Sequence, residues 1–181
     1  MFGLFSKKNK GVTVYDNIWI SEEAKFRACL EMNKANPTTV FIAWFEETRS
    51  ALENFFQRNS VAKQVHLADR LNADFADKEL IFVEHHPSAS EEQRKATELG
   101  KNEITVLSAL TEPLFRLFNG DKIIEMMKKM GINEDEMLEN GMITSSIRKA
   151  QEEIAKKTTI SGSSRSQADW LLNAGIGQQF S

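Results

Sequence analysis

The chain has 181 residues, of which 41% are hydrophobic and 27% are charged. This composition is typical of a globular protein, and the length suits one domain with an appendage. The formal net charge is -3, without the basic surplus of a general nucleic-acid-binding protein, so we expect no nucleic-acid partner. Apolar runs fall short of the roughly 20 residues that span a bilayer. The single cysteine fits a reducing, cytoplasmic location.

The first twelve residues predict a flexible terminus. Residues 1–10 are apolar and then basic, which is the reverse of the order in a signal peptide. A weak contact with an anionic membrane surface is the alternative, because apolar side chains can insert while lysines meet the headgroups. We therefore expect the folded part to start at residue 13.

The first part of the chain alternates strand and helix patterns. Residues 13–20 are rich in β-branched and aromatic residues, as in a strand. The acids after Ser21 favour a helix over 22–35, because the helix dipole favours acids in the first turn. Residues 38–45 end in a continuous apolar run, which is typical of a strand buried on both faces. A helix is expected over 46–58.

The same alternation continues further along the chain. Three more strands are expected, over 64–68, 79–84 and 103–108. The helix between the last two of these strands is expected to end at Leu99, before Gly100. Strands that alternate with helices favour an α/β fold built on a parallel sheet, here over residues 13–111.

Beyond this region the pattern becomes helical. Apolar residues recur at helical spacing up to Gly131, which is expected to end that stretch. An acidic turn at 133–136 follows, and a final amphipathic helix is expected to begin at Ser145 or Ser146. The sequence therefore predicts an α-helical extension over 112–157.

Two groups of apolar residues are candidates for binding a partner. They are Met126, Met127 and Met130 in the extension, and Trp170, Leu171 and Leu172 in a linker and short amphipathic segment over 158–181. Methionine suits adaptable binding surfaces, but these methionines can also pack the joint between the sheet and the helices. The last segment can dock into a partner's groove or fold back onto its own domain.

Two segments carry a family resemblance. Leu114 to Lys156 reads LFRLFNGDKIIEMMKKMGINEDEMLENGMITSSIRKAQEEIAK, and Tyr15 to Phe56 combines Asp-Asn-Ile-Trp, a lysine-containing helix and a buried strand. The first segment resembles the junction between the second nucleotide-binding domain and the scaffold helix of SecA, the preprotein translocase ATPase family. The second resembles the start of that domain. With weaker similarity between them, the resemblance covers about residues 13–157. It implies a small RecA-like parallel sheet flanked by helices, with a helical extension.

The resemblance also implies that the motor chemistry is lost. The first nucleotide-binding domain of the family carries the phosphate-binding loop G-x-x-x-x-G-K-[ST], and this chain contains no such sequence. The second domain contributes arginines from Q-x-x-G-R-x-G-R, which stabilise the charge on the transferring phosphoryl group. The matching stretch here begins with Gln93, Arg94 and Lys95 and has neither arginine in register. These three residues are the candidate nucleotide contacts.

We therefore interpret the chain as a non-catalytic SecA-like interaction module, accessory to protein export, with no catalytic residues. The resemblance implies SecA itself, the translocon or preproteins as partners. One alternative is a half-motor that completes an ATP site in trans with a P-loop partner, the only role in which ATP would be a cofactor. Another is a nucleic-acid-binding helicase-like remnant, which the acidic composition disfavours. No metal is expected, because His85 and His86 are neighbours at a strand end and should point to opposite faces.

Overall fold

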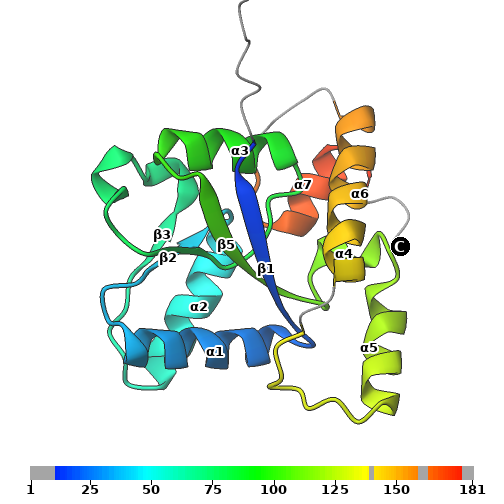
Figure 1. Ribbon diagram of the computed structural model, residues 1–181, viewed down its shortest axis with the longest axis horizontal. Helices are drawn as coiled ribbons and strands as arrows, with labels where there is room; N and C mark the ends of the chain where they lie inside the picture. Colours follow the sequence, from blue (N-terminus) through cyan, green and yellow to red (C-terminus); the bar gives the residue numbers. More distant parts are fainter. Residues whose placement is uncertain (1–10, 139–140, 159–162, 177–181) are drawn as a thin grey trace, which may run out of the picture.

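A parallel sheet lies at the centre of the protein (Figure 1). The computed structural model describes residues 11–138, 141–158 and 163–176. The strands are β1 (Thr13–Trp19), β2 (Val40–Ala43), β3 (Val65–Leu67), β4 (Leu80–Phe82) and β5 (Glu103–Ala109). Their order across the sheet is β1-β5-β4-β2-β3, and every neighbouring pair is parallel. The predicted α/β fold with a RecA-like parallel sheet is confirmed.

Helices cover both faces of this sheet (Figure 1). One face is packed by α1 (Glu22–Ala35) and α2 (Glu46–Arg58), and the other by α3 (Ala89–Glu98) and the 3-10 turn η1 (Ala68–Arg70). A second such turn is η2 (Ala73–Phe75). Successive residues of β2 alternate between the two layers: Phe41 and Ala43 join the cluster under α1 and α2, while Ile42 joins the cluster under α3. This double burial explains the continuous apolar run in the sequence.

The helix ends of the sheet domain follow local signals. Ser21 caps α1, its Oγ accepting a hydrogen bond from the backbone N–H of Ala24 at 3.2 Å. Gly100 adopts φ of +69° just after α3, a conformation that glycine adopts without a steric penalty. The helices predicted over 22–35 and 46–58 are therefore confirmed with the same bounds.

Beyond the sheet, the predicted extension over 112–157 contains α4 (Pro113–Arg116), α5 (Gly120–Lys129) and α6 (Gly141–Lys157), and the segment over 158–181 contains α7 (Gln167–Asn173). We call these four helices together the helical extension. The helical stretch expected up to Gly131 is divided, because Asn119 takes the left-handed conformation with φ of 63°. The prediction that the final helix begins at Ser145 or Ser146 is wrong. Both serines lie inside α6, where their hydroxyls donate hydrogen bonds to carbonyl oxygens four residues earlier.

The extension packs against the carboxyl ends of the strands (Figure 1). Ile18, Ile20 and Phe45, from the ends of β1 and β2, share one apolar cluster with residues of α4, α6 and α7. The backbone N–H of Leu138 also donates a hydrogen bond to the carbonyl oxygen of Ile18 at 2.7 Å. The predicted unit over 112–157 thus shares its core with the sheet. Among the described residues, no helix is both long and apolar enough to cross a membrane.

Candidate functional site

The candidate site is the carboxyl edge of the sheet between β4 and β2. From β2 the chain continues outward to β3, whereas from β4 it turns the other way to β5. In open parallel sheets, ligands bind outside the carboxyl ends of the strands at such a switch point. The residues that follow β2, β4 and β5 therefore decide what this edge can bind.

Glu84 follows β4 and occupies the centre of this edge. Its Oε1 accepts hydrogen bonds from the backbone N–H groups of Trp44 and Phe45, each at 3.0 Å, and its Oε2 accepts one from the Thr48 hydroxyl at 2.7 Å. These donors form the N-terminus of α2, which has no side-chain cap of its own. A helix N-terminus is a favourable site for an anion, and here a carboxylate of the same chain takes that place.

Lys25 and Glu112 form a buried ion pair next to Glu84. Lys25 is 0% exposed, and its Nζ donates to Glu112 Oε1 at 2.6 Å and to the Val83 carbonyl oxygen at 2.7 Å. Burial lowers the pKa of Lys25, but the hydrogen bond to Glu112 and the charges of Glu112, Glu22 and Glu84 together outweigh it and raise that pKa. Burial raises the pKa of Glu112, and it raises the pKa of Glu84 to about 8. Two buried carboxyl groups thus share one buried ammonium.

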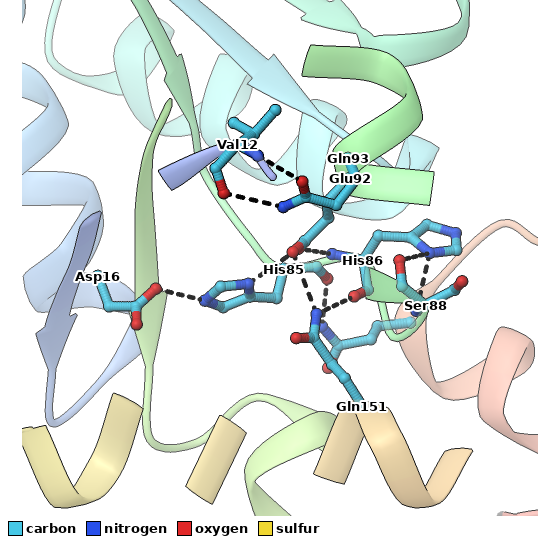
Figure 2. A network of polar contacts seen from close by, with 9 residues as sticks. Val12, Asp16, His85, His86, Ser88, Glu92, Gln93 and Gln151 are labelled. Carbon is cyan, nitrogen blue, oxygen red and sulfur yellow. Dashed lines mark hydrogen bonds and ion pairs between the residues drawn. The ribbon is translucent and has the colours of Figure 1, made fainter. Parts of the chain in front are cut away.

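A second charged group centres on His85, which is buried between two carboxylates (Figure 2). Its Nδ1 lies 2.8 Å from Glu92 Oε1 and its Nε2 lies 3.1 Å from Asp16 Oδ1. Burial lowers the pKa of His85, but the charges and hydrogen bonds of the two acids outweigh it and raise this pKa to about 10. The ring is therefore an imidazolium with both nitrogens engaged. It has no free nitrogen with which to act as a base.

Two glutamines of the extension complete this group. Gln151 of α6 donates through Nε2 to the carbonyl oxygen of His86 at 2.9 Å and to Glu92 Oε2 at 3.1 Å (Figure 2). Gln167 of α7 donates through Nε2 to the carbonyl oxygen of His85 at 3.0 Å. We call the following residues the polar joint: Asp16, His85, Glu92, Gln151 and Gln167. The polar joint fastens the helical extension to β1, to α3 and to the end of β4.

His86 points the other way, into an aromatic group. Its ring centroid lies 5.0 Å from that of Trp44, 5.7 Å from that of Phe45 and 5.2 Å from that of Trp170. Burial lowers the pKa of His86, so this ring stays neutral at pH 7. The two histidines thus perform different structural tasks. Within the described ranges, no three His, Cys, Asp or Glu side chains are arranged to hold a metal ion.

The candidate nucleotide contacts lie on α3, and their side chains are engaged within the protein. Gln93 binds both backbone groups of Val12, accepting from its N–H at 2.6 Å and donating to its carbonyl oxygen at 3.0 Å. Arg94 is exposed and forms ion pairs with two glutamates of its own helix. Lys95 is buried, and its Nζ donates to the Leu71 carbonyl oxygen at 3.1 Å and pairs with Glu98 Oε2 at 3.1 Å. The structure therefore does not bring these three side chains together at one site.

The candidate partner-binding residues divide into two groups. Three belong to the core: Met127, Trp170 and Leu171. Three are exposed: Met126 at 49%, Met130 at 68% and Leu172 at 55%. The short C-terminal helix α7 thus folds back onto its own domain. Methionine side chains of α5 remain at the surface.

No sequence motif identifies Lys25, Glu84, Glu92 or Glu112 as a site residue. One available signal was the position of Lys25 between Ala24 and Phe26, on the apolar side of its predicted helix. Another was the presence of an acid directly after the apolar strand β4. Charged residues are mostly exposed in folded proteins unless they are paired, and the partners of these four residues are distant in the sequence.

Comparisons with known proteins match a part of the chain. Protein translocase subunit SecA 1 of Alkaliphilus metalliredigens is 44% identical over 46 residues, which is 25% of this chain and 5% of that protein. SecA of Rubrobacter xylanophilus is 39% identical over 46 residues, and SecA of Psychrobacter cryohalolentis is 39% identical over 49 residues. No family model matches the chain. About a quarter of this chain is therefore a SecA-related segment, which spans about a twentieth of each of these relatives.

Proposed function

We propose that this chain is a non-catalytic SecA-like interaction module that serves protein export by binding a protein partner in the cytoplasm. The observation that carries this proposal is Glu84 at the N-terminus of α2. A phosphate at the switch point needs free N–H groups, and those of Trp44 and Phe45 already donate to the buried carboxyl group of Glu84. The site is therefore better suited to hold the fold together than to bind a nucleotide.

The candidate cations support the same interpretation. Arg94 is paired with glutamates of α3, and the buried ammonium of Lys95 contacts Glu98 and the carbonyl oxygen of Leu71. A charge-stabilising arginine must reach the transferring phosphoryl group. Among the described residues, neither Arg94 nor Lys95 forms a hydrogen bond with a residue at the N-terminus of α2.

The exposed methionines of α5 are the surface proposed for the partner. Met126 lies in α5, and Met130 is the C-cap residue of this helix, four positions later, so the two lie on the same side. Flexible methionine side chains adapt to different apolar partners. The matched relatives are named as protein translocase subunits, and this supports SecA itself, the translocon or a preprotein as the partner.

Calorimetric titration with Mg·ATP and Mg·ADP tests the non-catalytic part of the proposal. We expect no binding up to about 1 mM nucleotide, which corresponds to less than about 4 kcal/mol of affinity. Saturable binding would contradict this part and favour the half-motor that works in trans. In that event, Arg94→Glu should abolish ATP hydrolysis stimulated by a P-loop partner.

Biolayer interferometry tests the partner. Purified SecA, translocon in nanodiscs and an unfolded preprotein are immobilised in turn, and this chain is added at micromolar concentration. Binding to one of them should weaken about tenfold in the variant Met126→Ser/Met130→Ser, because buried apolar contacts at an interface are lost. Tyr15→Ser, an exposed apolar residue on β1, is the matched control. Absence of binding to all three would refute the proposal.

A further inference from the structure

A groove lies between α6 and the turn that joins α4 to α5. Its volume is about 490 Å³, which is large enough to hold an aromatic side chain. Apolar side chains from three separate parts of the chain contribute to its wall: Leu117, Phe118, Ala150, Ile154 and Ile176. All of them belong to the apolar cluster at the carboxyl ends of the strands or pack against it. The groove is therefore an open side of that core.

The rim of the groove carries charges of both signs. Lys149, Glu153 and Lys157 of α6 contribute to the lining and are exposed. They follow one another at intervals of one helical turn, so they lie on the same side of α6. The carboxylate offsets much of the attraction that the ammonium groups would offer to an anion. The apolar wall therefore decides what the groove holds.

The end of α7 directs the chain into this groove. Gly175 takes the left-handed conformation with φ of +74°, which glycine adopts without a steric penalty. Its N–H donates to the Leu172 carbonyl oxygen at 2.9 Å, and the N–H of Ile176 donates to the Leu171 carbonyl oxygen at 2.9 Å. This pair of hydrogen bonds is the Schellman motif, which ends a helix with a sharp turn of the chain. The turn places Ile176 in the wall of the groove.

The residues that follow Ile176 include one large apolar side chain. Residues 177–181 lie beyond the described part of the chain and read Gly-Gln-Gln-Phe-Ser. Phe180 is four residues after Ile176, and four residues span at most about 14 Å. A tether of this length gives an effective concentration of about millimolar. Phe180 is therefore held within reach of the groove by the chain itself.

The composition of this segment matches the groove. A phenylalanine side chain buries about 150–250 Å² and prefers contact with other aromatic rings. Phe118 in the wall already contacts Phe115, with ring centroids 5.1 Å apart. Gln178 and Gln179 are uncharged, and their amides can donate to a carboxylate or accept from an ammonium group. One aromatic residue after two neutral amides thus suits an apolar wall with a rim of mixed charge.

We propose that the side chain of Phe180 docks into this groove and closes it. The chain itself supplies the occupant, because Ile176 already forms part of the wall and Phe180 follows within reach. While Phe180 is docked, the groove is closed to apolar segments of other proteins. This inference does not rest on the proposed function, because the described lining of the groove includes neither Met126 nor Met130.

Nuclear Overhauser spectroscopy of the full chain tests the docked position directly. Methyl groups of alanine, leucine and isoleucine are labelled with carbon-13, and the phenylalanine rings stay protonated. We expect cross-peaks between ring protons of Phe180 and the methyl groups of Ala150, Ile154 and Leu117. The variant Phe180→Ala assigns these cross-peaks, because they should disappear from its spectrum. Absence of such cross-peaks in the original chain would overturn the proposal and leave the groove to a segment of another protein.

A dye that binds exposed apolar surface tests whether Phe180 closes the groove. Phe180→Ser should raise the fluorescence of 1-anilinonaphthalene-8-sulfonate at least about threefold, because an apolar hollow becomes accessible. Gln179→Ser is the matched control in the same segment and should leave the fluorescence unchanged. Phe180→Leu should keep the fluorescence low, because leucine also fills an apolar site. Equal fluorescence of Phe180→Ser and Gln179→Ser would refute the closure of the groove by Phe180.

Discussion

Replacing Gln151 with leucine should loosen the attachment of the helical extension. Gln151 is buried, and its amide donates to the carbonyl oxygen of His86 and to Glu92 Oε2. Leucine has similar size but no donor, so two buried acceptors lose a partner. Each buried acceptor left unpaired costs about 1–3 kcal/mol. Allowing for the apolar gain of leucine, we expect the free energy of unfolding to fall by roughly 2–4 kcal/mol.

Urea denaturation followed by circular dichroism measures this loss. Gln57→Leu is the matched control, because Gln57 is an exposed helical glutamine on α2. Substitutions at such surface positions usually change stability by less than about 0.5 kcal/mol. Hydrogen exchange should also show faster exchange in α6 of Gln151→Leu than in the original protein. Equal stability of Gln151→Leu and Gln57→Leu would refute the structural role of the polar joint.

Three further predictions concern pH, packing and thiol reactivity. The pKa of His85 is raised to about 10 in the folded protein, so its contribution to stability is complete below about pH 6.5 and is lost as pH rises to about 10. Thermal unfolding across this range should show the loss, and His85→Gln should flatten it. Gly120→Ala should destabilise by about 1–3 kcal/mol, because the new methyl group would lie 2.7 Å from a backbone carbonyl oxygen. Gly141→Ala, which has open space around it, should show no such loss in urea denaturation. Burial raises the pKa of the Cys29 thiol to about 12, so a thiol reagent at pH 7.5 should react only as urea unfolds the protein. Immediate reaction in the folded protein would contradict the burial of this thiol.

The layered fold was predictable because its signals are local. An apolar run such as 40–43 is buried on both faces, and a serine followed by acids begins α1. Each of these signals depends on a few adjacent residues. The start of α6 was missed for the same reason: Ser145 and Ser146 look like helix caps, but in the structure their hydroxyls bond to carbonyl oxygens inside the helix.

The polar joint was not predictable in the same way. His85 meets Asp16 across a sequence separation of 69 residues, and Gln151 meets His86 across 65. Nothing near any of these residues in the sequence identifies its partner. A charged residue beside apolar neighbours, such as Lys25, indicates burial but leaves the counter-charge open.

The groups at the carboxyl edge of the sheet hold the protein together, and this role conflicts with anion binding. For a phosphate to reach the N-terminus of α2, it would have to displace Glu84 from three hydrogen bonds. The displaced carboxylate would remain near Glu112, with Lys25 already paired. The phosphate would then gain the N–H groups but add its own charge to an acidic region. The hydrogen bonds of Glu84 at this edge therefore disfavour nucleotide binding.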